Sequence, residues 1–217
     1  MIRSACFAFL LACLLAAAAP HARADKSAND VNEGGLVFLE EPPGKPVHHH
    51  RNAVQITERS LDDGWTVLHQ CHENLDQVPA TQIVFNAERV RNLEVVKAGN
   101  VGRAWVDGPS VQLRDVGPGA KVCLRAETLA LRNHGDGTYS LNSGPFMRRF
   151  LDGYYPMRVS MSVELLTPEI RIVGIEPPPQ RGFRVQQRPD RIAYDTWFEG
   201  RLFTEIRFAT PDGFPLR

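Results

Sequence analysis

The feature that most constrains the fold is a strict alternation of apolar and polar residues over positions 157–165, in the run MRVSMSVEL. The odd-numbered residues of this run are apolar, and the even-numbered ones are Arg158, Ser160, Ser162 and Glu164. Successive side chains of an extended strand point to opposite faces, so the pattern predicts a β-strand with one buried and one solvated face. A sheet built from such strands must cover its apolar face with a second layer.

Short runs with the same period of two recur along most of the chain, bounded by Gly, Pro, Asn and Asp. No helical period continues over ten residues, although residues 144–153 leave room for one helical turn. Asp136 and Gly137 lie between two alternating runs, and this dipeptide is typical of a tight hairpin turn. About a dozen such runs predict an all-β fold, either a β-sandwich or a partly open barrel of many short antiparallel strands.

The first 24 residues have the composition of a secretory signal peptide. Arg3 gives a positive start, residues 5–19 are apolar, and the sequence HARA provides a cleavage site after Ala24. The apolar run is shorter than the roughly 20 residues that a membrane-spanning helix needs. A lipoprotein acylated at Cys13 is the disfavoured alternative, because the apolar run continues past that cysteine. We therefore expect a periplasmic or secreted protein with no transmembrane segment in the mature chain.

The region after the signal peptide divides into two parts by composition. Residues 25–46 are polar, contain Gly and Pro, and show no period, which predicts a disordered, flexible leader. Within it, LVFL at positions 36–39 is a candidate for a short edge strand. Residues 47–217 then form the β-sandwich domain, and a subdivision, if there is one, falls near residues 143–145.

Charge and motifs narrow the function classes. Signal cleavage removes Arg3 and Arg23 from the 25 basic residues and leaves all 25 acidic residues, for a net charge of −2. This balance provides no long-range field that attracts nucleic acid, so no nucleic-acid partner is expected. The sequence contains no GxSxG, Walker or dinucleotide-binding motif, and its adjacent carboxylates Asp62 and Asp63 lie in a turn. These observations favour a binding protein over an enzyme.

Two cysteines, Cys71 and Cys123, remain after signal cleavage. Each lies in a run with strand character, and an exported protein meets an oxidising environment, so we expect a disulfide between them. A crosslink that closes a loop of this length should stabilise the fold by about 4 kcal/mol. The alternative is a Cys71 thiolate that serves as a metal ligand.

Five histidines lie between positions 48 and 72, in the runs VHHH and HQCH. Imidazole is a good ligand for zinc and copper. His48 and His50 share a strand face, so one copper or zinc ion could take these two from one strand, His69 from its neighbour and His72 from the turn that follows. The alternative is that the histidines are polar surface residues or donate to backbone carbonyls.

The sequence GPFMRRFLDGYYP, residues 144–156, gathers aromatic residues around two arginines. Aromatic and arginine side chains are typical of recognition surfaces. The partner-binding residues predicted here are Phe146, Arg148, Arg149, Tyr154 and Tyr155. The alternative is that the aromatic residues close one end of a sandwich while the arginines stay in water.

Three functional hypotheses follow from these patterns. The first is an exported periplasmic binding or accessory protein that holds copper or zinc through His48, His50, His69 and His72. The second is a metal-free envelope protein that engages a polypeptide or glycan through residues 148–155. The third is a hydrolase or oxidase with a metal-bound water, which needs an open coordination position beside a cleft.

Overall fold

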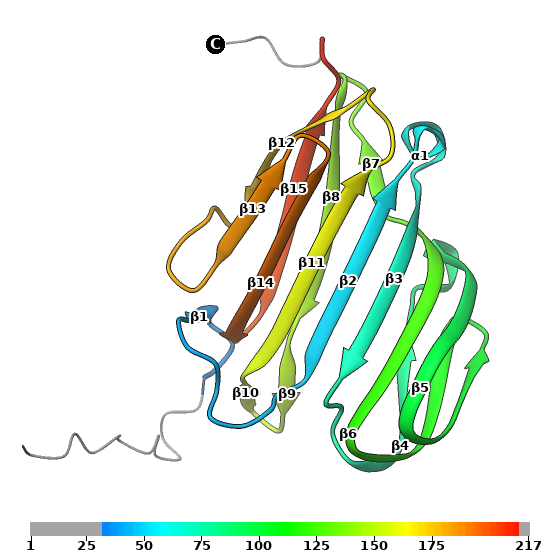
Figure 1. Ribbon diagram of the computed structural model, residues 1–217, viewed down its shortest axis with the longest axis vertical. Helices are drawn as coiled ribbons and strands as arrows, with labels where there is room; N and C mark the ends of the chain where they lie inside the picture. Colours follow the sequence, from blue (N-terminus) through cyan, green and yellow to red (C-terminus); the bar gives the residue numbers. More distant parts are fainter. Residues whose placement is uncertain (1–31, 213–217) are drawn as a thin grey trace, which may run out of the picture. The chain divides into compact units, whose positions relative to one another are not determined.

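The computed structural model describes residues 32–212, and its largest element is a nine-stranded sheet (Figure 1). The strands run in the order β1-β14-β11-β2-β3-β6-β4, with β13 beside β14 and β5 beside β6. The pair β11 and β2 is parallel, whereas the other pairs are antiparallel. The strand bounds are Val37–Leu39 (β1), His49–Ile56 (β2), Trp65–Glu73 (β3), Val78–Val84 (β4), Val90–Asp107 (β5), Ser110–Leu129 (β6), Met157–Leu165 (β11), Arg184–Arg188 (β13) and Arg191–Glu199 (β14).

A four-stranded sheet, in the order β12-β15-β8-β7, lies behind the β14, β11 and β2 part of the large sheet in Figure 1. Its strands are Leu131–Asn133 (β7), Thr138–Phe146 (β8), Arg171–Glu176 (β12) and Leu202–Ala209 (β15). One hydrophobic core contains buried side chains from both layers, including Met161 of β11 and Phe208 of β15. The described chain is therefore all-β and sandwich-like, which confirms the predicted fold class.

Strand β11 has the alternation that the sequence predicts. Its odd-numbered residues are buried in the core between the layers, whereas its even-numbered residues are partly exposed on the other face. Burying an aliphatic side chain of this size contributes roughly 1.5–3 kcal/mol. The inner face of the large sheet is the face that meets the four-stranded sheet, and we call the opposite face the outer face.

Strands β5 and β6, with 18 and 20 residues, are longer than the many short strands predicted from the sequence. The pairing of β5 with β6 continues through several register shifts. Asn100 (φ 56°) and Gly119 (φ 63°) adopt left-handed backbone conformations within the two strands, which bend there and do not end. The first half of β6 pairs with β4 and the second half with β3. A second hydrophobic cluster joins the two halves and includes Leu113 and Leu124.

The predicted hairpin turn at Gly137 is present between β7 and β8, which pair antiparallel. Gly137 has φ 79°, a left-handed conformation that glycine adopts without strain. The helical turn considered for residues 144–153 is wrong. This segment instead completes β8 and forms a hairpin from β9 (Arg148–Phe150) and β10 (Gly153–Tyr155), with a tight turn that begins at Leu151 (φ 51°).

One short α-helix, α1 (Glu58–Asp63), connects β2 to β3. At its start, the Thr57 N–H donates to Ser60 Oγ (3.0 Å), and Gly64 with φ 75° ends it. Six residues are too few to show a helical period in the sequence. A 3₁₀ turn (η1, Ala87–Arg89) precedes β5. Within residues 32–212, no helix has the length and apolarity to cross a membrane.

The beginning of the described chain pairs with the large sheet. Val37–Leu39 forms β1 against β14, the short edge strand expected in LVFL. The predicted signal peptide, residues 1–24, and the first residues of the predicted leader lie outside the described residues. All described residues belong to one compact unit, and β8 runs through residues 143–145.

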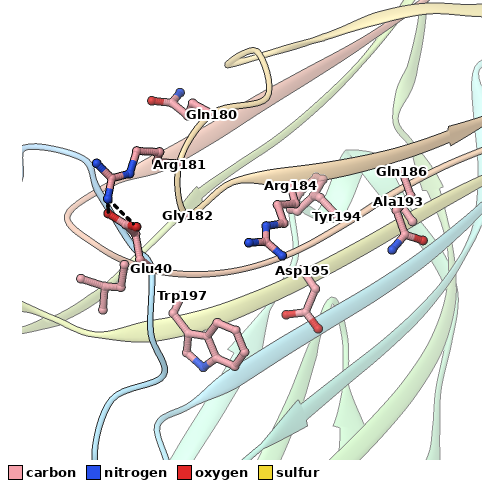
Figure 2. A pocket seen from close by; sticks show the side chains of 11 residues that line it. Glu40, Gln180, Arg181, Gly182, Arg184, Gln186, Ala193, Tyr194, Asp195 and Trp197 are labelled. Carbon is pink, nitrogen blue, oxygen red and sulfur yellow. Dashed lines mark hydrogen bonds and ion pairs between the residues drawn. The ribbon is translucent and has the colours of Figure 1, made fainter.

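The free edge of β14 is shared by two short strands. β1 pairs with residues 197–199 of β14, and β13 pairs with residues 191–195. The connection from β12 to β13 passes this junction, where the Gly182 carbonyl accepts a hydrogen bond from Thr196 Oγ1 (2.7 Å). A cavity of about 720 Å³ lies beside the junction (Figure 2).

Candidate functional site

The three consecutive histidines at the start of β2 are divided between the two faces of the large sheet. His50 shares the inner face with the core residues of β2. His49 lies on the outer face, where its ring contacts Ser160 of β11. His48 precedes β2, and its ring lies against His72 of β3. Because side chains alternate along a strand, adjacent histidines enter different environments.

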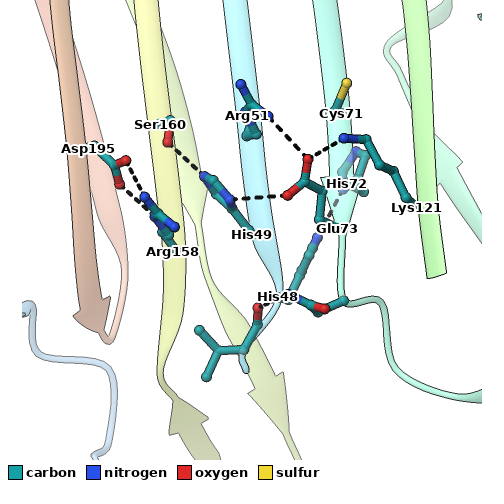
Figure 3. A network of polar contacts seen from close by, with 12 residues as sticks. His48, His49, Arg51, Cys71, His72, Glu73, Lys121, Arg158, Ser160 and Asp195 are labelled. Atoms are coloured by element: carbon teal, nitrogen blue, oxygen red, sulfur yellow. Dashed lines mark hydrogen bonds and ion pairs between the residues drawn. The ribbon is translucent and has the colours of Figure 1, made fainter. Parts of the chain in front are cut away.

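His48, His50 and His72 form one group of imidazole rings, which we call the inner histidine cluster. His48 Nε2 and His72 Nδ1 are 3.0 Å apart, and Figure 3 shows these two side chains pointing toward one another. The ring centroids of His50 and His72 are 4.4 Å apart, and those of His48 and His50 are 6.3 Å apart. The cluster forms because His50 and His72 are direct partners across β2 and β3.

Burial keeps the inner histidine cluster uncharged. It lowers the pKa of His48 to about 4 and the pKa of His50 to about 3, from an ordinary value of 6.5. The pKa of His72 also lies well below its ordinary value, first because of burial and second because His50 and His48 are close. All three rings are therefore neutral near pH 7, and neutral imidazole is the form that binds transition metals.

A chain of hydrogen bonds orients the neutral His72 ring. Its Nε2 donates to Gln70 Oε1 (3.2 Å), because an amide oxygen can only accept. Gln70 Nε2 in turn donates to Asn52 Oδ1 (3.1 Å). The other ring nitrogen, Nδ1, therefore carries a lone pair, which accepts the hydrogen bond from His48 Nε2.

Among the described residues, one fully buried ring nitrogen of the cluster has no hydrogen-bond partner. His50 Nε2 is buried and bonds to no atom of the described residues. An unpaired buried polar atom costs roughly 1–3 kcal/mol. Within residues 32–212, no group of three or more His, Cys, Asp or Glu side chains is arranged to hold a metal ion as it stands. A shared ligand for the three rings therefore requires at least one of them to turn.

The structure does not bring His69 to the cluster. His69 is exposed on the outer face of β3, whereas His72 lies on the inner face and is only 6% exposed. Positions three apart on a strand face opposite ways, so the predicted set of four histidines does not assemble. Cys71 also lies on the outer face, where it forms the predicted disulfide with Cys123, its direct partner in β6. Because its sulfur is bonded to Cys123, Cys71 is not the thiolate ligand of the alternative.

The outer face of the sheet, opposite the inner histidine cluster, carries a charged network (Figure 3). His49 Nε2 lies 2.7 Å from Ser160 Oγ, and His49 Nδ1 lies 3.6 Å from Glu73 Oε2. Glu73 Oε1 accepts hydrogen bonds from Lys121 Nζ (2.6 Å) and Arg51 Nη1 (3.2 Å). Burial is the main cause that lowers the pKa of His49 to about 4. His49 Nε2 thus has a hydrogen-bond partner, whereas the 3.6 Å between His49 Nδ1 and Glu73 is too long for a hydrogen bond.

The predicted partner-binding residues lie on and beside the β9–β10 hairpin. The Arg148 guanidinium lies 5.7 Å from the ring centre of Tyr155, and the Arg149 guanidinium lies 5.7 Å from that of Tyr154. Phe146 is separate from this group, because it is 7% exposed and belongs to the hydrophobic core. Four of the five residues therefore gather on the hairpin, and Phe146 closes the sandwich beside it.

The tip of the hairpin exposes two apolar side chains that were not among the predicted site residues. Phe150 is 68% exposed and Leu151 is 77% exposed. Near the base of the hairpin, the Phe146 ring meets the His50 ring edge-on at a centroid distance of 5.1 Å. The two regions predicted separately from the sequence, the histidines and the Arg-aromatic segment, are therefore neighbours.

Sequence reasoning missed several polar partners of the histidines. Gln70 could have been found, because it lies two residues before His72 and therefore on the same face of the predicted strand. Asn52 likewise lies two residues after His50, on the same strand face. Ser160 gave no such signal, because β11 reaches His49 only through the parallel pairing of β11 with β2, which no local pattern reveals.

Comparisons with known proteins do not assign the chain to a family. No protein-family model matches the sequence, and no curated protein matches it. Two structures of an M1 zinc metallopeptidase from Deinococcus radiodurans are similar to the chain. One is a mutant bound to a Tyr-Ser-Ala substrate, with a TM-score of 0.43, 10% identity, and coverage of 75% of this chain and 42% of that chain. The other has a TM-score of 0.40, 12% identity, and coverage of 82% and 43%.

The present chain thus spans less than half the length of either peptidase structure. Similarity at this level carries no inference about activity.

Proposed function

We propose that the protein is an exported binding protein of the cell envelope that holds a copper or zinc ion through His48, His50 and His72. The observation that carries the proposal is the buried, unpaired Nε2 of His50 beside two further neutral imidazoles. The Cys71–Cys123 disulfide supports an oxidising compartment such as the periplasm.

The metal ion would take the place of the proton between His48 and His72. Their facing nitrogens are 3.0 Å apart. Two nitrogens bound to one tetrahedral ion at about 2.0–2.1 Å are separated by roughly 3.3 Å, so a small outward movement suffices. Rotation of the His50 ring then brings its Nε2 toward the same point. Three imidazoles suit zinc and copper and leave a fourth position for another ligand.

The surroundings of the cluster favour this ligand set. The Gln70 amide oxygen holds the proton on His72 Nε2, so that the lone pair of Nδ1 faces His48. Second-shell hydrogen bonds of this kind fix the orientation of ligating histidines in metal proteins. The low pKa values of His48 and His50 mean that binding at neutral pH requires no release of a proton from a charged imidazolium.

Calorimetric titration of the untagged mature chain with Zn²⁺ and Cu²⁺ tests the proposal. We expect one ion per chain, and binding at least 100-fold weaker in His50→Gln and His72→Gln. His69→Gln is the matched control, because it changes an exposed histidine on the same strand as His72 and should leave the affinity unchanged. Absence of stoichiometric binding, or equal losses in His69→Gln and His72→Gln, would contradict the proposal.

A second candidate function is a polypeptide-binding role for the β9–β10 hairpin. The specific observation is the exposure of Phe150 and Leu151 at its tip, since exposed apolar side chains beside Arg and Tyr are typical of interaction sites. Arg148 Nη2 donates a hydrogen bond to Asp76 Oδ1 (2.7 Å), and this bond connects the base of the hairpin to the segment between β3 and β4.

Crosslinking in the native envelope tests this second role. A photoreactive amino acid at position 150 should crosslink to one discrete polypeptide, and Leu151→Ser should abolish that product. The matched control is the same probe at position 203, because Phe203 is also exposed (57%) but lies on β15. The same product from both positions would show non-specific contact and reject the role.

A further inference from the structure

The cavity at the divided edge of β14 has the chemistry of a ligand site. Its volume of about 720 Å³ falls in the range of roughly 300–1,000 Å³ that small-molecule sites occupy. Its lining comes from segments far apart in the sequence, namely the end of β1, the connection before β13, β13 itself and β14 (Figure 2). None of these segments takes part in the inner histidine cluster.

The floor of the cavity is the outer face of β14. Ala193, Asp195 and Trp197 alternate with residues that are buried in the sandwich, so their side chains face outward. Arg184 and Gln186 of β13 are the direct partners of Asp195 and Ala193, and paired residues share a face. The short side chain of Ala193 leaves space beside the Gln186 amide. The floor therefore presents the indole and the carboxylate of β14 and the guanidinium and the amide of β13 on one face of the sheet.

The charges of the cavity do not cancel completely. At its rim, Arg181 Nη2 lies 2.7 Å from Glu40 Oε1. On its floor, Asp195 accepts two hydrogen bonds from Arg158, at 2.8 Å and 2.5 Å. The Arg184 guanidinium has no hydrogen bond or ion pair with any residue between positions 32 and 212. One cation is thus left for a ligand, and an arginine fork matches the geometry of a carboxylate.

The Trp197 ring offers a flat apolar surface beside that cation. The Arg158 guanidinium lies 4.5 Å from the Trp197 ring centre. Arg158 lines a neighbouring cavity of about 350 Å³ and not the larger one, although Trp197 lines both. We conclude that Arg158 covers the ring from the side of the smaller cavity. Trp197 also lines the larger cavity beside Leu39, its direct partner in β1, and there it offers an apolar surface against which a sugar ring could pack.

We propose that this cavity binds a carboxylated saccharide, a uronic acid within an oligosaccharide. The sugar carboxylate pairs with Arg184, a sugar ring packs against Trp197, and hydroxyl groups bond to the Gln186 amide and the Asp195 carboxylate. Asp195 can accept further hydrogen bonds, because a carboxylate has about four lone-pair positions. A dianionic phosphate fits less well, because the cavity offers one free guanidinium and its lining also contains the carboxylates of Asp195 and Glu40.

Titration of the untagged mature chain with trigalacturonate and with trimannuronate, in the presence of a metal chelator, tests this proposal. Calorimetry and tryptophan fluorescence should both report saturable binding of at least one of the two. Galactotriose, which lacks the carboxylates, should bind at least tenfold more weakly, and an acidic tripeptide should not compete. Arg184→Gln should weaken uronate binding at least tenfold. Arg171→Gln, a change at an exposed arginine of β12, should have no effect.

Several outcomes would overturn the proposal. These are no binding of either uronate, equal binding of the neutral trisaccharide, competition by the peptide, or equal effects of Arg184→Gln and Arg171→Gln. Arg184 is exposed and makes no side-chain bond within the described residues, so its variant should keep the wild-type melting temperature. The chelator makes the outcome independent of metal binding by the inner histidine cluster.

Discussion

His49 and His50 are neighbours in the chain, yet they lie in opposite environments. On the outer face, the His49 ring contacts Ser160 and Glu73 and belongs to a network of charged groups. On the inner face, His50 packs with His72 and keeps one nitrogen unpaired. One step along a strand therefore decides whether an imidazole joins the polar contacts of the outer face or becomes a candidate ligand on the inner face.

The two faces also differ in how they stabilise this end of the sheet. The outer face holds β2 to β3 and β6 with ion pairs and a disulfide, whereas the inner face relies on packing and neutral hydrogen bonds. Four predictions test this contrast.

The largest effect is expected from the covalent link on the outer face. Replacing both Cys71 and Cys123 with serine should lower the free energy of unfolding by about 4 kcal/mol, because the unfolded chain loses its closed loop. Urea unfolding followed by circular dichroism measures this quantity. A loss below about 1 kcal/mol would mean that noncovalent pairing of β3 with β6 already provides the stability.

The second prediction concerns pH and the inner face of the metal-free protein. The pKa values of His48 (about 4) and His50 (about 3) lie below the ordinary 6.5 of the unfolded chain. Between these values the unfolded chain binds more protons, so the free energy of unfolding falls as the pH falls through this window. The slope is up to about 1.4 kcal/mol per pH unit for each histidine. Urea unfolding from pH 7 to pH 5 should show a smaller slope in His50→Gln than in the wild type.

The third prediction concerns the ion pairs of the outer face. Glu73→Gln weakens the contacts with Lys121 and Arg51 and should cost about 1 kcal/mol of unfolding free energy, less at high salt. Glu94→Gln is the control, because the Glu94 side chain is 55% exposed and meets Arg125 only at 3.5 Å. Equal costs in the two variants would show that the network around Glu73 adds nothing to an ordinary surface pair.

The smallest effect is expected at His69. His69→Ala should change the free energy of unfolding by less than about 0.5 kcal/mol, because the side chain is exposed on the outer face. It should also leave metal affinity unchanged. A large loss of metal binding in this variant would place His69 in the site and contradict the division between the faces.

The alternation of apolar and polar residues predicted those features of the fold that depend on which face of a strand a residue occupies. The alternation in residues 157–165 indicated β11, and Cys71 and Cys123 in strand-like runs indicated the disulfide that the structure contains. The same rule placed His48 and His50 together. It also placed His69 and His72 on opposite faces, and the expected turn that would reunite them is absent because β3 continues through Glu73.

The remaining features depend on pairing between distant segments. The cavity beside Trp197 exists because β1 and β13 divide the edge of β14, and an ion pair at its rim joins Glu40 to Arg181. Neither pairing leaves a signature in the sequence of β14 alone. The period of two in β14 could still have predicted that the Trp197 side chain faces outward. The structure agrees, because the neighbouring side chains of Thr196 and Phe198 are buried.

X-ray absorption spectroscopy of the zinc-loaded protein tests most directly whether strand alternation gathers His48, His50 and His72 around one ion. The expected result is a first shell with three imidazole nitrogens, reduced by one in His50→Gln and unchanged in His49→Gln. Fewer than three imidazoles in the wild type, or the same loss in His49→Gln as in His50→Gln, would contradict it.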